Sequence, residues 1–359
     1  MSNRMNRLMV VGASTALAIG VLAPAALAQS PAASMGTMPA LPAPEKTTLN
    51  IGLSVTETSQ YAAKLAEQAG IWEKYGITPV ITVFEGDGKT MQALQAGQLD
   101  IGFIGVSAAI NSQVTDAPVK ILGTNAIILS DNLIAVPDVK TADDLRGKCV
   151  AISTFGGTSH GSSILSLQAL GLTPADVVIT EIGGQSARIA ALEGGACQAA
   201  VVDVALQAEM EGKGFNALTN LKELGLPWGR SGFAVTEEWL AANPNTTLNA
   251  LAATLEGQNM MWADPAKAAE YYAAFREIEP AEAEALIADF QSVGDRTMMW
   301  VDGAFENPKL ILSTVNPDIS EVDITTAYDR APLETLKEMG LYDALGIPAE
   351  AFPAASPAS

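Results

Sequence analysis

Short apolar runs alternate along this chain with segments whose apolar residues follow helical spacing. The first part predicts strands near residues 51–54, 80–83 and 101–106, and a helix from Tyr61 to Ala69 that places Tyr61, Leu65 and Ala69 on one stripe. Buried strands that alternate with helices form βαβ units. The pattern therefore predicts an α/β fold with parallel sheets.

The chain repeats this pattern 98 residues later. The segment 93–106, which has the pattern of a helix end, a glycine stop and a buried strand, is similar to 191–204. The same offset, within one residue, relates the strands at 80–83 and 178–181 and those at 51–54 and 150–153. Three matches in the same order predict two similar lobes, each beginning β-α-β-α-β.

Two segments are predicted to connect the lobes. The chain is expected to cross at 125–138, just before a capping box at Thr141 and Asp144, and to return at 227–235. Two connections make a hinge, which suits closure on a ligand. Helices then dominate, with Thr236 and Asp264 as N-caps, and are expected to pack on the first lobe. The predicted helices lie at 237–240, 248–263, 265–275, 280–290 and 328–341.

Both ends of the chain are predicted to lie outside the lobes. Arg4 and Arg7, an apolar run to Leu22 and the Ala26-Leu27-Ala28 cleavage pattern predict a signal peptide at 1–28. A membrane anchor is the alternative, but the run is short and broken by glycine and proline. The expected division is signal peptide 1–28, leader 29–46, first lobe 47–130 and 232–345, second lobe 131–231 and tail 346–359. The leader is expected to be extended and poorly ordered, and the mature protein periplasmic.

Composition narrows the function. A formal net charge of −20 makes nucleic acid a poor partner, because phosphate binding needs clustered Lys and Arg. His160 is the sole histidine, so a metal site built from imidazoles is excluded. We expect no catalytic residue, no metal and no cofactor.

The repeat itself predicts where a ligand binds. In open α/β sheets ligands lie beyond the carboxyl ends of the strands, so a cleft between the lobes would be lined by the loops that follow them. The candidate ligand-binding residues are Ser54, Thr56, Glu57, Thr58, Gln60, Tyr61, Gly105, Ser107, Ser153, Gly156, Gly157, Thr158, Ser159, His160, Asp203 and Arg230.

The loop 153–160 is the sharpest of these candidates. Its small residues and hydroxyls lead from a strand into a helix N-terminus, which favours an oxyanion, although a plain Ser/Thr helix cap gives the same pattern. Asp203 can hold an amine or ring N–H, or cap the next helix.

Several other candidate residues each have two alternative roles. Arg230 and Arg188 can pair with a ligand anion or with acidic residues of the hinge. Tyr61 and Trp228 can stack on a planar ligand or belong to the core. Glu57, Asp87 and Asp203 disfavour a purely anionic ligand unless they point away from the cleft.

The two cysteines, Cys149 and Cys197, are expected at the starts of neighbouring strands in the second lobe. Adjacent strands lie about 4.8 Å apart, which is within disulfide range. We therefore predict a disulfide far from the cleft.

Several segments together resemble the nitrate/sulfonate/taurine family of ABC-transporter solute-binding proteins, which is related to the thiamine-pyrimidine-synthase-like group. The resemblance extends over about 49–275. The segments that carry it are Asp143-Asp144-Leu145-Arg146-Gly147-Lys148, Gly157-Thr158-Ser159-His160, Ala69-Gly70-Ile71-Trp72-Glu73-Lys74-Tyr75-Gly76-Ile77, Leu94-Gln95-Ala96-Gly97-Gln98-Leu99-Asp100-Ile101-Gly102, and Glu237-Glu238-Trp239-Leu240 with Asn243-Pro244.

The resemblance implies a type II periplasmic binding fold that delivers a small solute to a membrane permease. The expected ligand is a small organic solute, either sulfonate- or taurine-like or pyrimidine-like, bound by a monomer. The enzymes of the superfamily use a cysteine-rich motif and several histidines, which this sequence lacks. A partner of a membrane sensor and an exported enzyme are the alternatives.

Overall fold

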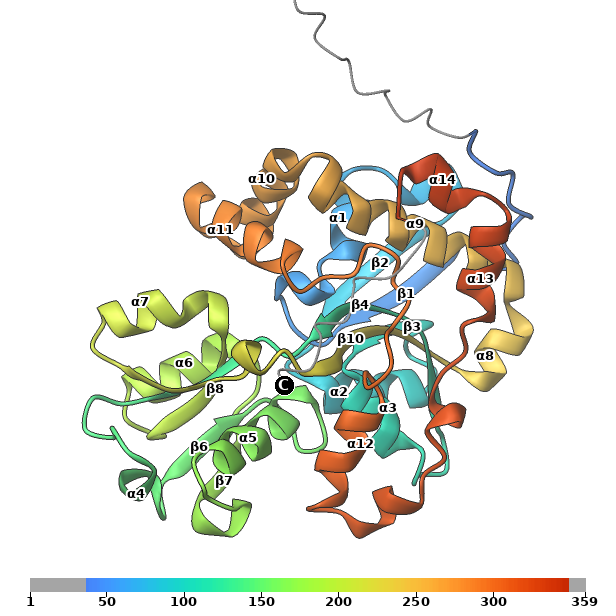
Figure 1. Ribbon diagram of the computed structural model, residues 1–359. Coiled ribbons are helices and arrows are strands. Elements are labelled where there is room, and N and C mark those ends of the chain that lie inside the picture. The colour runs from blue at the N-terminus through green and yellow to red at the C-terminus, as the bar shows by residue number, and fades with distance from the viewer. Residues whose placement is uncertain (1–36, 349–359) are drawn as a thin grey trace, which may run out of the picture. The chain divides into compact units, whose positions relative to one another are not determined.

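The computed structural model describes residues 37–348 (Figure 1). The predicted signal peptide, residues 29–36 of the leader and residues 349–359 of the tail lie outside the described residues. No helix in the described part is long and apolar enough to cross a membrane.

The first sheet contains five strands in the order β2-β1-β3-β10-β4. Strands β2, β1 and β3 are parallel, and β10 runs antiparallel to both of its neighbours. The strands are β1 (Thr48–Leu53), β2 (Thr78–Val83), β3 (Ile101–Ile104), β4 (Val119–Ile128) and β10 (Pro227–Thr236).

The second sheet repeats this arrangement in the order β7-β6-β8-β5-β9. Here β7, β6 and β8 are parallel, and β5 is antiparallel to both β8 and β9. The strands are β5 (Asp131–Ala135), β6 (Cys149–Ile152), β7 (Val178–Glu181), β8 (Ala199–Asp203) and β9 (Asn216–Asn220).

The two sheets confirm the predicted repeat and the α/β fold. Strands β1, β2 and β3 occupy the same places in the first sheet as β6, β7 and β8 in the second. In each sheet the fourth position is filled by the strand that follows a crossing from the other lobe, β10 or β5. We call the part built on the first sheet the first lobe and the part built on the second sheet the second lobe. The exact lobe boundaries stay a prediction.

The first crossing lies within the predicted segment 125–138, whereas the return crossing comes before the predicted segment 227–235. Only residues 129–130 and 221–226 separate strands of different sheets, whereas most of 125–138 and all of 227–235 belong to strands. These segments are almost wholly buried, so their backbone groups must be paired within a sheet. Most residues of the two predicted connecting segments therefore belong to the strands β4, β5 and β10, which flank the crossings.

Helices cover the sheets, and the C-terminal part of the chain is helical, as predicted. The predicted caps are present: Thr141 forms a capping box with Asp144, Thr236 accepts from the Trp239 N–H, and Asp264 accepts from the Lys267 N–H. The helices are α1 (Ala62–Gln68), α2 (Asp87–Gln95), α3 (Val106–Ser112), α4 (Ala142–Leu145), α5 (Thr158–Ala169), α6 (Gln185–Glu193), α7 (Gln207–Gly212), α8 (Glu237–Ala242), α9 (Pro244–Ala263), α10 (Pro265–Arg276), α11 (Pro280–Gln291), α12 (Glu306–Ser313), α13 (Ala331–Glu338) and α14 (Leu341–Leu345).

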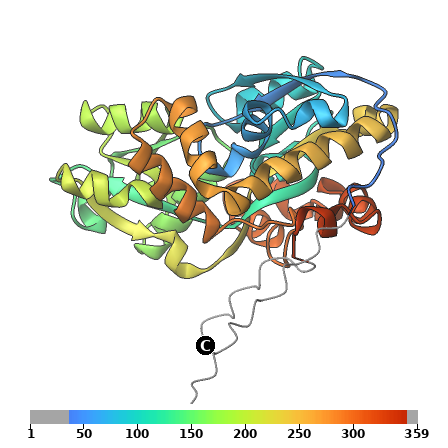
Figure 2. The same ribbon diagram turned by 90° about the horizontal axis from the view of Figure 1, so that it is seen from above.

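Most of the C-terminal helices pack on the first lobe, as expected. Helix α9 lies against α1, and α13 contacts both α9 and β4 (Figures 1 and 2). Two helices also reach the second lobe: α12 contacts α5, and α11 contacts the 3-10 turn Val204–Leu206 after β8. The C-terminal part therefore contributes to both sides of the junction between the lobes.

The end of the leader is held in place. The Glu45 carboxylate accepts from the Asn245 and Thr246 N–H groups at the start of α9, and Lys46 forms an ion pair with Asp100. Leu41 packs against the first core. The prediction that the leader is poorly ordered up to residue 46 was wrong for this part, because a carboxylate is stabilised at a helix N-terminus.

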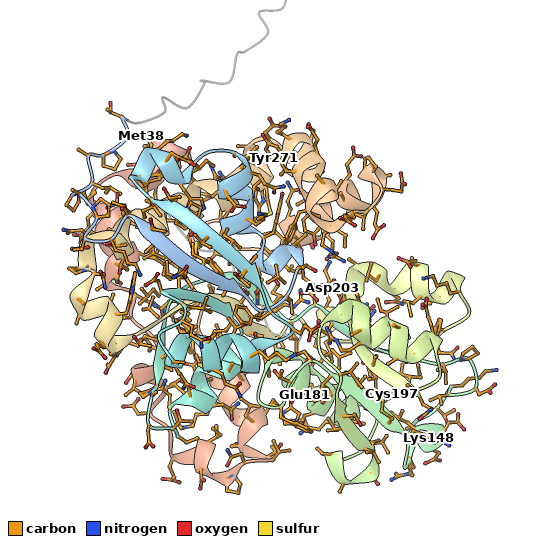
Figure 3. The ribbon with its side chains drawn as sticks, turned by 180° about the vertical axis from the view of Figure 1, so that it is seen from behind. Met38, Lys148, Glu181, Cys197, Asp203 and Tyr271 are labelled. Atoms are coloured by element: carbon orange, nitrogen blue, oxygen red, sulfur yellow. A yellow bond between two sulfur atoms is a disulfide. The ribbon has the colours of Figure 1, made fainter. Side chains whose placement is uncertain are left out.

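A disulfide joins Cys149 and Cys197, whose Cα atoms lie 4.7 Å apart. It lies at the start of β6 and just before β8, two adjacent parallel strands. Figure 3 shows Cys197 and Lys148 at the end of the second lobe opposite Asp203. The disulfide is therefore remote from the carboxyl ends of these strands.

Candidate functional site

The carboxyl ends of the parallel strands in both sheets meet at the junction between the lobes. A small cavity of about 40 Å³ lies there, and Asp203 marks the second-lobe side of the junction in Figure 3. The cavity is lined by Val55, Glu57, Ser59, Gln60, Asp87, Asp131, Ser153, Thr158, Ser159, Arg188 and Arg230. Both lobes contribute charged groups to it.

Asp87, the first residue of α2, connects three segments with its carboxylate. Oδ1 accepts from the Ser54 hydroxyl at 2.6 Å and from the Gly105 N–H at 3.1 Å. Oδ2 accepts from the Thr158 N–H, the first helical N–H of α5, at 3.2 Å. The N-cap residue of α5 is Gly157, which has no side chain to bond this end of the helix. A carboxylate of the first lobe therefore occupies the N-terminus where a ligand oxyanion was expected.

Arg230, on β10 of the first lobe, forms ion pairs with two acidic residues of the second lobe. Its Nη2 lies 2.9 Å from Asp131 Oδ1 and 2.7 Å from Asp203 Oδ2, and its Nη1 donates to the Ser130 hydroxyl. Burial disfavours the guanidinium, but Asp131 and Asp203 outweigh it and hold the pKa of Arg230 above its ordinary value. Arg230 was predicted to pair either with a ligand anion or with acidic residues of the hinge. In the structure it pairs with the acidic residues.

Asp203 is engaged in the same way. Its Oδ1 accepts from the Ala205 N–H as a cap of the next turn, and Oδ2 takes the bond from Arg230. Both oxygens thus have protein partners.

Glu57 and Arg188 face each other across the cavity without a good bond. Arg188 Nη2 lies 3.9 Å from Glu57 Oε1, which is too long for a hydrogen bond. Glu57 Oε2 and Arg188 Nε are buried with no partner among the described residues. Burial raises the pKa of Glu57, against the opposing influence of Arg188 and Arg230, and burial lowers the pKa of Arg188.

The loop 153–160 is positioned by its own hydroxyls and by the first lobe. The Ser159 hydroxyl accepts from the Ser153 N–H at 2.8 Å and lies 2.6 Å from the Ser153 hydroxyl. Gly156 has a φ of 77°, and its carbonyl accepts a hydrogen bond from the Asn111 side-chain amide at 2.8 Å. A Cβ at Gly156 would lie 2.8 Å from Asn111 Nδ2, so both its conformation and the close approach of the lobes require glycine.

Gln60 holds the matching loop of the first lobe. Its Oε1 accepts from the Ser54 and Val55 N–H groups, and its Nε2 donates to the Ser54 hydroxyl at 2.6 Å. The side chain therefore closes the loop on itself and sets the position of Glu57 at the cavity wall.

The structure brings together part of the predicted site. Six predicted residues line the cavity: Glu57, Gln60, Ser153, Thr158, Ser159 and Arg230. Ser54, Gly105 and Asp203 lie directly behind it, bonded to Asp87 or Arg230. Gly157 is the N-cap of α5.

Other predicted residues do not line this cavity. The Thr56 carbonyl accepts from the Tyr272 hydroxyl, Thr58 is buried in the 3-10 turn Thr58–Gln60, and Ser107 is buried in α3. Polar character alone could not tell these positions from cavity-facing ones.

The aromatic candidates belong to the core. Tyr61 is fully buried beside Tyr272 and Phe275, with ring centroids 4.7 and 5.7 Å away, and donates to Gln68. Trp228 is fully buried in the cluster with Leu129, Ile164 and Leu221. The suggestion that either ring stacks on a ligand does not fit these positions, because packed neighbours cover both rings.

Gly156 and His160 line a second, larger groove. It has a volume of about 630 Å³ and is lined by α2, α3, α12 and the second-lobe segments near Phe155, Pro174 and Ile179. His160 Nδ1 accepts from the Gly156 N–H, and burial lowers the pKa of His160. Among the described residues that line the groove there is no Asp, Glu, Lys or Arg. The charged residues line the small cavity instead, and we therefore take that cavity as the candidate site.

Sequence reasoning left five cavity residues out of the selected set: Val55, Ser59, Asp87, Asp131 and Arg188. Asp87 and Arg188 were in the predicted loops and were considered for their effect on a ligand anion, but they were not among the selected ligand-binding residues. Asp131 had a usable signal, since it is a charged residue inside an otherwise apolar run at the lobe crossing.

Two sheets of this strand order, joined by two crossings and meeting at a polar cavity, define the periplasmic binding protein fold, a fold of solute-binding proteins. The family model described as "NMT1/THI5 like" matches residues 59–268. The chain belongs to this NMT1/THI5-like family.

Solved structures share the fold at low sequence identity. The nitrate-binding protein NrtA from Synechocystis PCC 6803 has a TM-score of 0.69 at 17% identity, over 86% of this chain and 93% of its own. The alkanesulfonate-binding protein SsuA from Xanthomonas axonopodis pv. citri, bound to MOPS, has a TM-score of 0.66 at 18% identity, over 81% of this chain and 99% of its own. The desulfurization enzyme DSZB shares the fold too, with a TM-score of 0.58 at 15% identity, over 82% of this chain and 100% of its own.

A protein from Brucella abortus (strain 2308) that is named as a binding protein is 38% identical to this chain over 107 residues. The match covers 30% of this chain and 32% of that relative, so the chain matches about a third of the relative's length. The relative's name gives no ligand.

Proposed function

We propose that this protein is the extracytoplasmic solute-binding component of an ABC importer. In this proposal a small organic solute binds at the junction between the lobes. The observation that carries the proposal is the cavity at the strand ends, where Glu57 and Asp87 of one lobe face Arg188 and Ser159 of the other. A cavity built from two halves of a hinged molecule suits capture and release of a ligand.

Binding in this proposal requires the lobes to move. A volume of about 40 Å³ has room for roughly one water molecule, not an organic solute. The contacts that close the junction include polar bonds, such as Asp87 to Thr158 and Asn111 to Gly156, and the apolar packing of Ile164 against Trp228. The two short crossings are the points about which the lobes can separate.

The partners follow from the same proposal. A cleaved signal peptide would place the protein in the periplasm, as a monomer that meets an ABC permease in the inner membrane. A membrane sensor in place of the permease is the alternative partner. An exported enzyme, with the precedent of DSZB for this fold, is the less favoured reading, since His160 bonds a backbone N–H rather than a nucleophile.

A ligand screen tests the proposal. The mature protein is unfolded and refolded to remove copurified compounds, then melted with sulfonates, taurine, nitrate, pyrimidines, flavins and aromatic acids. A true ligand at about 100 times its Kd stabilises the fold by about 2.7 kcal/mol, which is a clear rise in Tm. The bound compound should be recovered unchanged. Conversion of the compound would support the enzyme, and a flat screen would count against the solute classes proposed.

A further inference from the structure

The carboxylate of Glu57, at the junction between the lobes, has an oxygen that no hydrogen bond from the described residues satisfies. Glu57 is 7% exposed, lines the cavity, and its Oε2 has no partner among the described residues. An unbonded buried carboxylate oxygen is costly, so such groups are rare unless they serve a ligand or another function. Its nearest cation, Arg188, stands 3.9 Å from the other oxygen.

Two positions that would attract a ligand anion, the N-terminus of α5 and Arg230, are already filled by the protein's own carboxylates, whereas Arg188 Nε has no partner among the described residues. Asp87 bonds the first N–H of α5, and a helix N-terminus is the usual place for a bound oxyanion in folds of this kind. Arg230 is held by both Asp131 and Asp203. An incoming anion would have to displace a bonded carboxylate at either place.

The charges that line the cavity agree with this. The cavity is lined by three carboxylates, those of Glu57, Asp87 and Asp131, and by two guanidinium groups, those of Arg188 and Arg230. Arg276 also acts electrostatically on Glu57, but it donates to the Tyr272 hydroxyl and is not among the cavity residues. A purely anionic solute therefore enters a site of like charge, whereas a donor of positive character does not.

From these contacts we propose that the solute carries an N–H donor, such as an ammonium, an amidinium or an aminated ring, which bonds Glu57 Oε2. Glu57 is then the residue that determines specificity, and simple oxyanions without such a donor are rejected. The inference rests on the proposed function, since it assumes that the junction is where the solute binds. It differs from what the names of the nitrate- and alkanesulfonate-binding structures would suggest for this chain.

The test uses pairs of probes that differ in the donor. Isothermal titration calorimetry compares taurine with isethionate and 4-aminopyrimidine with pyrimidine, and nitrate and ethanesulfonate serve as bare oxyanions. At least one donor-bearing probe should bind the wild-type protein about tenfold or more tightly than its partner, the range for a hydrogen bond to a charged group. Nitrate and ethanesulfonate should bind no better than isethionate.

Variants assign the preference to Glu57. Glu57→Gln should reduce the preference within a pair to about threefold or less, because the carboxylate charge is lost. Glu57→Asp, which keeps the charge on a shorter side chain, should retain part of it. Glu85→Gln is the matched control: it makes the same chemical change on an exposed side chain of a neighbouring loop and should leave the preference unchanged.

The outcomes separate the two proposals. If nitrate or isethionate binds as tightly as taurine, or if Glu57→Gln keeps the full preference, solute binding stands and the inference is overturned. If no probe of any class binds, the proposed function is contradicted as well, and the inference with it.

Discussion

At the residue scale, the junction contains two kinds of charged group. Asp87, Asp131, Asp203 and Arg230 bond one another or nearby N–H and hydroxyl groups, and they hold the lobes in register. Glu57 is buried, and its Oε2 has no partner in the part of the chain that the structure describes. The first kind contributes to stability, whereas the second costs stability, as is common at functional sites.

Replacing Glu57 is therefore expected to stabilise the ligand-free protein. Burial raises the pKa of Glu57 above its ordinary 4.5, although Arg188, Arg230 and Arg276 oppose the shift. The folded state then binds the proton more tightly than the unfolded chain, so stability falls as the pH rises from 4.5 through the raised pKa. Glu57→Gln should raise the free energy of unfolding by about 1–2 kcal/mol at pH 7.5.

The pH dependence provides the check. In urea unfolding the gain from Glu57→Gln should shrink as the pH falls below 4.5, where Glu57 is protonated in both states. Arg188 keeps its bond to the Val201 carbonyl in the variant. A loss of stability at pH 7.5, or a gain that does not change with pH, would contradict the assignment.

Replacing Arg230 should have the opposite effect. Arg230→Ala leaves Asp131 and Asp203 buried and facing each other, and breaking a buried pair in this way costs about 3–5 kcal/mol. Arg146→Ala is a suitable control, because Arg146 pairs with Asp143 and Asp176 on the surface, where about 1 kcal/mol or less is expected. Equal losses in urea unfolding would mean that the hinge pair is no stronger than a surface pair.

At the element scale, helix ends and strand pairs were the most predictable features. Thr141, Thr236 and Asp264 cap the helices that follow them in sequence. Helix α5 is different, because its first N–H is bonded by Asp87, 71 residues earlier in the chain. A cap within the same segment can be seen in the sequence, whereas a cap from another lobe cannot.

The disulfide links β6 to the start of β8 and should stabilise the second lobe. The cysteines are 48 residues apart, a separation for which the chain-entropy relation gives about 4 kcal/mol. The Cys149→Ala/Cys197→Ala double variant should lose stability of that order in urea, and a thiol titration of the unreduced wild-type protein should find no free thiol. Because the bond is remote from the junction, affinity for a ligand should not change; a large loss of affinity would argue otherwise.

At the scale of the whole molecule, closure depends on how near the lobes can approach. Gly105 of the first lobe lies so close to α5 that a Cβ there would be 2.0 Å from Thr158 Oγ1 and 3.0 Å from Asp87 Oδ2. Its φ is −67°, which any residue adopts, so close packing requires the glycine, and the shortest approach is that of Thr158 from the other lobe. The position thus reports on closure rather than on folding.

Gly105→Ala should hold the lobes apart without unfolding either of them. The radius of gyration in small-angle scattering should rise, and affinity for any ligand should fall about tenfold or more, since the junction cannot close. Adding Thr158→Ala removes the hydroxyl that clashes and should restore part of the affinity. Gly212→Ala is the control, because nothing lies within 4 Å of a Cβ at that position. An unchanged radius and affinity in Gly105→Ala would refute this reading.

The sequence by itself determined the elements and their order. Apolar periodicity and the 98-residue repeat predicted two α/β lobes, and the matching sheet orders confirm them. Capping residues located helix starts, since a cap bonds N–H groups two or three residues away. These features depend on neighbours along the chain, so they can be inferred without knowing the fold.

The tertiary structure decided which polar residues face one another. Arg230 and Asp131 are 99 residues apart, and Tyr61 and Glu57, four residues apart in one turn, face the core and the cavity respectively. Pairing of charges over such separations follows from how the lobes pack, because electrostatic and hydrogen-bond partners act over a few ångströms in space and not along the chain. For this reason the composition of the loops predicted the region of the candidate site, and only the packing showed that Asp87 bonds the N-terminus of α5 and that Glu57 Oε2 has no partner among the described residues.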